Sequence, residues 1–168
     1  MLARRAFVLG LPAALGACGF RPLFGQADHP EVRDQLAAIE ISGLGSRLGQ
    51  LVRNALLEEL NPSSLSVPAR YQLLVAVRET SSSLGIQLDS TITRYNLTLI
   101  ARFRLLDLDS RELLYQSTVR RIASYNVPRQ PYAELAAERD AEQRAAKEVG
   151  TNIRTLLAVH FARQTPTV

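Results

Sequence analysis

Hydrophobic and polar residues alternate most regularly between positions 94 and 106. One set of alternate positions is apolar: Tyr95, Leu97, Leu99, Ala101, Phe103 and Leu105. The other set is mostly polar: Arg94, Asn96, Thr98, Ile100, Arg102 and Arg104. A repeat of two residues is typical of a β-strand that buries one face. We therefore expect Leu99 to face the core and Thr98 to face away from it.

The residues that follow predict a strand that returns antiparallel to this one. Residues 107–111 are expected to form the turn and residues 112–126 the returning strand. A pairing centred on Ser110 keeps apolar side chains on the face of Leu97 and Phe103, whereas a shifted register would bring polar side chains there. The apolar residues placed on this face are Leu113, Tyr115, Val119, Ala123 and Tyr125. The same register gathers four arginines on the opposite face: Arg94, Arg102, Arg104 and Arg120.

Two further strands are predicted earlier in the chain. Residues 39–41 form a short candidate, and residues 71–78 again alternate between apolar and other side chains. The three serines at 81–83 are expected to interrupt the second strand, and alternation resumes over residues 84–88. This segment is therefore either one bent strand or two short ones, followed by a turn at residues 89–90.

Two segments have the residue spacing of amphipathic helices. The first covers roughly residues 47–60 and is capped by Ser46. The second is a long helix over residues 132–163, rich in Ala, Glu, Arg and Leu, in which Gly150 is a point where the helix can bend. Charged residues at positions 134–147 are expected to pair at i,i+4 spacing on a solvated face of this helix.

The predicted elements occur in the order β-α-β-β-β-α. A sheet with one apolar face has to bury that face, and two amphipathic helices supply the cover. We therefore predict an α+β fold in which two amphipathic helices pack on one face of a four-stranded, mostly antiparallel sheet. Residues 39–168 are long enough to form this fold as a single domain.

The first eighteen residues have the pattern of a lipoprotein signal peptide. The basic pair Arg4-Arg5 precedes an uncharged run of twelve residues, Ala6 to Ala17, which is too short to span a bilayer. The run ends in a bacterial lipobox: Leu15, Gly16, Ala17 and Cys18. Leu15 suits an apolar pocket of a peptidase, the small residues allow access to the backbone, and the Cys18 thiol accepts a diacylglyceryl group. We predict cleavage after residue 17 and attachment of diacylglycerol and palmitate at Cys18, with residues 18–38 as a lipidated tether.

Several acyl chains on one cysteine hold a protein stably on a membrane. Gly19, rather than Asp, follows the lipidated cysteine, which favours the outer membrane and its periplasmic side. The segment around Arg4-Arg5 also resembles a twin-arginine export signal, so the export route stays open between that pathway and the general secretory one.

Charge and reactive residues exclude several classes of function. The chain has a net charge of +4, and without Arg4 and Arg5 this falls to +2, too little for the basic field that nucleic-acid binding requires. The sequence contains none of the common hydrolase, phosphate-loop or dinucleotide motifs, and its two histidines are His29 in the tether and His160 near the end of the long helix. We expect no enzyme activity, no catalytic residue, no metal site and no cofactor other than the lipid.

Two stretches of sequence resemble the LptE family of lipopolysaccharide-assembly lipoproteins, in its alphaproteobacterial form. They are CGFRPLFG at residues 18–25 and AELAAERDAEQRAAKEV in the long helix. The resemblance implies two helices on a four-stranded sheet and an outer-membrane protein that plugs the large LptD β-barrel. It also implies a role in assembling that barrel and delivering lipopolysaccharide to the cell surface. The four arginines named above are then candidates for contact with lipopolysaccharide or with the barrel. The alternative is another lipoprotein adaptor of an envelope transport complex.

Overall fold

The computed structural model describes residues 30–86, 92–127 and 130–164. Its elements are α2 (Pro30–Ala37), β1 (Ile39–Ser42), α3 (Arg47–Leu60), β2 (Tyr71–Ile86), β3 (Ile92–Asp107), β4 (Leu113–Asn126) and α4 (Pro131–Gln164). The predicted order β-α-β-β-β-α is confirmed, with one short helix added before it. Cys18, His29 and the predicted turn at residues 89–90 lie outside the described residues.

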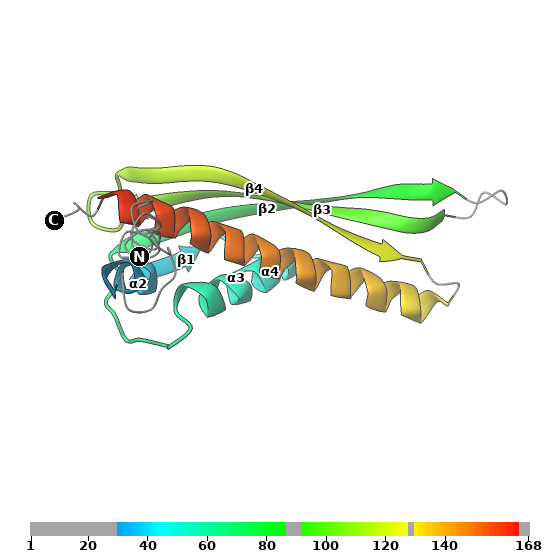
Figure 1. Cartoon of the computed structure of the whole chain (residues 1–168), viewed down its shortest axis with the longest axis horizontal. Coiled ribbons are helices and arrows are strands. Elements are labelled where there is room, and N and C mark those ends of the chain that lie inside the picture. The colour runs from blue at the N-terminus through cyan, green and yellow to red at the C-terminus, as the bar shows by residue number, and fades with distance from the viewer. Residues whose placement is uncertain (1–29, 87–91, 128–129, 165–168) are drawn as a thin grey trace, which may run out of the picture.

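The four strands form one sheet in the order β1-β2-β3-β4. The short strand β1 runs parallel to β2, and the other neighbouring strands are antiparallel. Helices α3 and α4 lie on the same side of this sheet, and α4 extends along much of its length (Figure 1). The molecule therefore has two layers, and we call the sheet face turned away from α3 and α4 the outer face.

The predicted register between β3 and β4 is confirmed along most of its length. Leu97 pairs with Ala123 and Ala101 pairs with Val119, the pairing that is centred on Ser110. Leu97 and Leu99 are completely buried between the sheet and the helices. Thr98 faces outward as expected, but only 9% of it is exposed. It lies between Thr80 and Ile122 on the neighbouring strands.

The prediction for Leu113 is wrong. The register shifts between Leu105 and Leu106, so that Leu113 pairs with Leu106. A one-residue shift moves a side chain to the other face of a sheet, and Leu113 is accordingly 47% exposed.

The predicted interruption at the three serines is also wrong. Strand β2 continues through residues 81–83, where Ser81 pairs with Leu97 and Ser82 pairs with Asn96. Backbone pairing with β3 maintains the strand, and the serine side chains are exposed, so they need not follow the apolar pattern. Of the two alternatives, a single strand rather than two short ones is therefore correct.

The end of the predicted tether is folded rather than extended. Residues 30–37 form α2, in which Pro30 occupies the first position, where a missing N–H is tolerated. Val32 and Leu36 lie one helical turn apart and are only 5% and 4% exposed. The tether prediction overlooked this pair because a single turn shows too little of the helical repeat.

Helices α3 and α4 pack closely against each other. Ser46 caps α3 as predicted, accepting a hydrogen bond from the Gly49 backbone N–H at 3.0 Å. Helix α4 is assigned as one helix through Gly150. A Cβ at residue 150 would lie 3.2 Å from the backbone of Ala55 in α3, so this glycine permits close approach of the two helices.

Candidate functional site

The outer face of the sheet carries a group of arginines from three strands. Neighbouring positions across the strands bring Arg78 and Arg120 to either side of Ile100. The complete group, called here the arginine face, is Arg78, Arg94, Arg102, Arg104 and Arg120. Four of the five were predicted. Arg78 was overlooked, although its place in the alternation of residues 71–78 puts it on the side opposite Val77.

Acidic side chains do not balance this positive charge. The described outer-face positions of β2, β3 and β4 hold no Asp or Glu, and Glu40 on the edge strand β1 is the single acidic residue at the described outer-face positions of the sheet. None of the ion pairs among the described residues involves the arginine face, and all five arginines are exposed. Arg94 donates a hydrogen bond through Nε to Asn126 Oδ1 at 3.2 Å. The face therefore presents guanidinium groups that are available to an anionic partner.

A hollow of about 560 Å³ opens on this side of the sheet. Arg102 and Arg104 contribute to its lining together with the small or apolar side chains of Ala76 and Leu74. The remaining lining residues are Phe103, Gln116, Ser117 and Thr118. The hollow is partly open to solvent, so it suits part of a larger amphiphilic or protein surface better than a fully enclosed small molecule.

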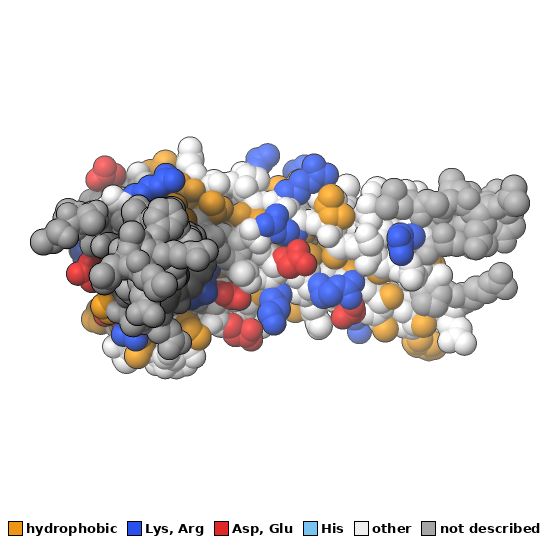
Figure 2. Space-filling model, in the orientation of Figure 1, with side chains coloured by type: hydrophobic (Ala, Val, Ile, Leu, Met, Phe, Trp, Pro, Cys, Tyr) orange, Lys and Arg blue, Asp and Glu red, His pale blue; other side chains and the backbone are white. Residues whose placement is uncertain are grey.

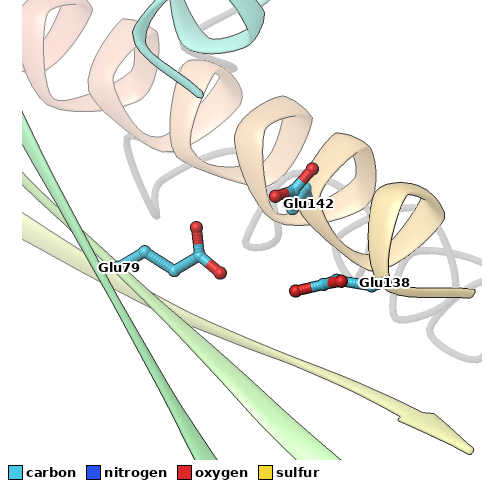
Figure 3. Close-up of side chains that lie close together, drawn as sticks. All are labelled: Glu79, Glu138 and Glu142. Atoms are coloured by element: carbon cyan, nitrogen blue, oxygen red, sulfur yellow. The ribbon is translucent and has the colours of Figure 1, made fainter. Parts of the chain in front are cut away.

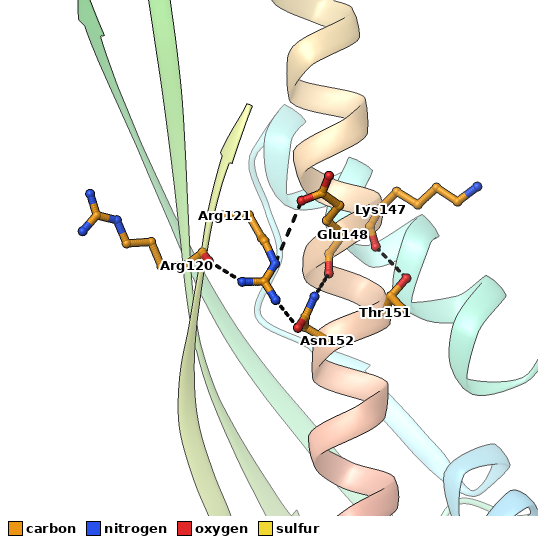
Figure 4. A network of polar contacts seen from close by, with 6 residues as sticks. All are labelled: Arg120, Arg121, Lys147, Glu148, Thr151 and Asn152. Atoms are coloured by element: carbon orange, nitrogen blue, oxygen red, sulfur yellow. Dashed lines mark hydrogen bonds and ion pairs between the residues drawn. The ribbon is translucent and has the colours of Figure 1, made fainter. Parts of the chain in front are cut away.

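The helical side has a different distribution of charge. Basic and acidic side chains are interspersed over the middle of the molecule in the view of Figure 2. Arg121 contributes to this pattern, because it donates to Asn152 Oδ1 in α4 and lies 4.0 Å from the Glu148 carboxylate. Figure 4 shows Arg121 directed toward α4, whereas the neighbouring Arg120 points to the opposite side of the strand. Adjacent arginines thus have separate roles, one in packing and one on the open face.

The charged residues of α4 correct one expectation. Asp140 and Arg144 form the predicted i,i+4 ion pair on the surface. Glu142, by contrast, is only 3% exposed and pairs with Arg47 of α3. Spacing contained a signal for this, because Glu142 precedes the buried Val149 by seven residues and therefore shares its helix face.

His160, near the end of α4, is half-buried. Its ring stacks on Tyr115 with centroids 4.8 Å apart, and a ring nitrogen lies 3.1 Å from Gln164 Nε2. Burial, and secondarily the positive charge of Arg163, lower the pKa of His160. These contacts give the histidine a packing role at the end of α4.

No helix in the described parts of the chain is both long enough and apolar enough to cross a bilayer.

Comparison with known proteins identifies a family to which the chain is similar. The family model for LptE, lipopolysaccharide-assembly, matches residues 35–157. A Caulobacter crescentus protein assigned as a lipoprotein is 31% identical, with a TM-score of 0.69, over 81% of this chain and 98% of its own. No curated protein matches the sequence significantly.

More distant structures share the fold. A minor lipoprotein from Acinetobacter baumannii has a TM-score of 0.57 and 16% identity, covering 77% of this chain and 92% of its own. An uncharacterized lipoprotein B from Nitrosomonas europaea has a TM-score of 0.52 and 16% identity, covering 74% of this chain and 83% of its own. The family match spans more than half of the sequence and agrees with the observed order of elements. The chain therefore belongs to the LptE family of lipopolysaccharide-assembly proteins.

Proposed function

We propose that this protein is an outer-membrane lipoprotein, anchored through Cys18 on the periplasmic side, that plugs a large LptD-like β-barrel. In this role it assists assembly of the barrel and delivery of lipopolysaccharide to the outer leaflet, without catalysing a reaction. Its membership of a lipopolysaccharide-assembly family and the lipobox at residues 15–18 support this proposal. The observation that carries it is the arginine face, a positively charged surface that neither α3 nor α4 covers.

The chemistry of the arginine face suits an anionic partner. Lipopolysaccharide carries phosphates and carboxylates, and a guanidinium group can donate two parallel hydrogen bonds to either. The hollow beside Arg102 and Arg104 adds an apolar floor at Leu74 and Ala76. Acidic residues inside a barrel would offer the same carboxylate chemistry. The two partners are therefore distinguished by experiment.

The test is the double variant Arg102→Glu/Arg104→Glu in the full-length, detergent-purified protein. We expect it to lose affinity for lipopolysaccharide or for the barrel, while its melting temperature stays that of the wild type because both side chains are exposed. Arg53→Glu/Arg139→Glu, on α3 and α4, makes the same change in net charge and is the matched control. Wild-type binding should also weaken as salt is added, because exposed charges are screened.

The outcome assigns the partner. Loss of lipopolysaccharide binding alone indicates contact with the lipid, and loss of barrel copurification alone indicates contact with the lumen. Unchanged affinity for both in a folded double variant would mean that the arginines solubilise an exposed sheet and cover its apolar residues with their stems.

The barrel partnership has its own test. A membrane pull-down with the wild-type protein should recover a large outer-membrane β-barrel. Recovery of an envelope transport complex without such a barrel would instead support the alternative, an adaptor lipoprotein.

A further inference from the structure

Three carboxylates converge between the sheet and α4. Glu79 lies on the inner face of β2, and Glu138 and Glu142 are one turn apart on α4. One carboxylate oxygen from each of the three residues lies within 4.8 Å of the other two. Figure 3 shows Glu79 reaching from the strand toward the helix and Glu138 reaching toward the strand. Residues far apart in sequence thus supply three oxygen ligands to one small volume.

The charges in this volume are not balanced. Within the described part of the chain, an ion pair joins this cluster to Arg47 of α3 through Glu142 Oε1. By formal charge, three carboxylates and one guanidinium give a net charge of −2. Burial, and then the charges of Glu142 and Glu138, raise the pKa of Glu79 above its ordinary value. Repulsion within the cluster therefore destabilises the folded protein unless a further positive charge is present.

An independent observation at Glu142 points to a missing partner. Glu142 is 3% exposed, and its second oxygen, Oε2, is completely buried without a hydrogen-bond partner among the described residues. A buried carboxylate oxygen without a partner is unfavourable, because it has lost its hydration and gained no interaction in return. Such oxygens in proteins are usually satisfied by a hydrogen bond or by a cation.

We propose that Glu79, Glu138 and Glu142 bind a divalent cation, with Ca²⁺ preferred. Ca²⁺ binds oxygen at about 2.3–2.6 Å, so one ion can touch three oxygens that lie up to about 4.5 Å from one another, and the cluster needs only a small contraction to reach this spacing. Mg²⁺ binds at about 2.0–2.1 Å and touches three oxygens only when they lie within about 3.6 Å of one another, so it requires a larger contraction of the cluster. Glu79 and Glu138 are partly exposed, which leaves room for water to complete the coordination.

The ion would neutralise the cluster and join two layers of the fold. A doubly charged cation balances the net charge of −2 and supplies the partner that Glu142 Oε2 lacks. It would connect β2 to the N-terminal half of α4, and the pair between Arg47 and Glu142 would extend the connection to α3. This site differs from the expectation, drawn from the sequence, that the chain has no metal site.

The full-length, detergent-purified protein is first treated with a chelator. Calorimetry and thermal melting of this protein then test the proposal. CaCl₂ added at about pH 7.5 should bind with a Kd of about 0.1–1 mM, in the range of extracellular calcium modules, and should raise the melting temperature. MgCl₂ should give a smaller rise. Glu79→Gln should melt higher than the wild type without calcium, because a repelling charge is gone, and should lose the calcium response.

Two further variants make the test specific. Arg47→Gln removes a competing positive charge and should tighten calcium binding several-fold. Glu58→Gln removes an exposed carboxylate of α3 and should keep the full calcium response.

Two results would overturn the proposal. One is a calcium response that persists unchanged in both Glu79→Gln and Glu138→Gln, because the ion would then bind elsewhere. The other is a wild-type protein that ignores about 5 mM Ca²⁺, above the expected Kd, but is stabilised by mild acid. In that case shared protons, and not a cation, neutralise the carboxylates.

Discussion

At the scale of single residues, Gly150 determines how closely the two main helices approach. Its position would place a Cβ 3.2 Å from the Ala55 Cβ and from the Ala55 backbone. Contacts this short require movement of a helix, since a backbone cannot rotate away as a long side chain can. Glycine in a helix interior is unfavourable by about 1 kcal/mol relative to alanine, so close packing has to offset that cost.

Replacing Gly150 should therefore destabilise the fold. We expect Gly150→Val to lower the free energy of unfolding by about 1–3 kcal/mol, because it forces α3 away from α4. Urea denaturation followed by circular dichroism measures this loss. Gly45→Val is the matched control, since a Cβ there has no atom within 4 Å, and it should change stability by less than about 0.5 kcal/mol. Equal losses in both variants would contradict the close-approach argument.

His160 gives the fold a dependence on pH. Its pKa is lowered in the folded protein, chiefly by burial and then by Arg163, so the unfolded chain takes up its proton first on acidification. The stability linked to this residue is complete above the ordinary value of 6.5 and is lost as the pH falls through the lowered pKa. The groups that contact the ring are Tyr115, Phe161 and Gln164.

We expect His160→Phe to remove this dependence while keeping an aromatic ring beside Tyr115. Melting temperatures measured across the range below pH 7 should fall more steeply for the wild type than for His160→Phe. Parallel curves for the two proteins would show that protonation of His160 is not linked to folding.

At the scale of elements, α2 shows why part of the fold escaped prediction. Strand β3 could be predicted from its six apolar alternate positions. The same alternation in β4 determines the register between these two strands. In α2, only Val32 and Leu36 repeat, and Pro30 reads as a helix breaker although it begins the helix. The shift beside Leu105 is equally hidden, because apolar residues stand at both 113 and 114.

The arginine face and the carboxylate cluster differ in the same respect. Alternation along β3 and β4, with one register, was enough to place Arg102, Arg104 and Arg120 together. The cluster combines Glu79 from a strand with Glu138 and Glu142 from a helix. No repeat within either element specifies which turn of α4 lies over which residue of β2, so this contact depends on tertiary packing.

The core position of α2 leads to a prediction for Leu36. We expect Leu36→Ala to lower the free energy of unfolding by about 2–5 kcal/mol, the usual cost of truncating a buried leucine. Arg33→Ala, on the exposed side of the same helix, should cost less than about 0.5 kcal/mol. Urea denaturation of the two variants measures the free energy of unfolding of each. If Leu36→Ala were as stable as Arg33→Ala, residues 30–37 would be a tether after all.

At the scale of the whole molecule, the two sides of the sheet have divided roles. The helices bury the inner face, and the outer face keeps its arginines exposed. A protein that plugs a barrel has to fold on its own while presenting a charged surface to a partner, and this division permits both. In the proposed function, its position at the membrane would depend on the lipid at Cys18.

The proposed anchor at Cys18 predicts a specific chemical form of the mature protein. Mass spectrometry of membrane-extracted protein should find no peptide from residues 1–17 and a lipid-modified Cys18 at the N-terminus. Cys18→Ala removes the thiol that accepts the lipid, so this variant should be released into the soluble periplasmic fraction or remain unprocessed.

The fold should survive this change, because the buried residues of the described structure begin at Val32, well after the cysteine. Circular dichroism should therefore give the same spectrum for Cys18→Ala and for the wild type. An intact, unmodified Met1 on the native protein would contradict the lipobox interpretation. The arginine face would then have to reach its partner from a protein that is not held at the membrane by lipid, and the proposed role as a barrel plug would lose its anchor.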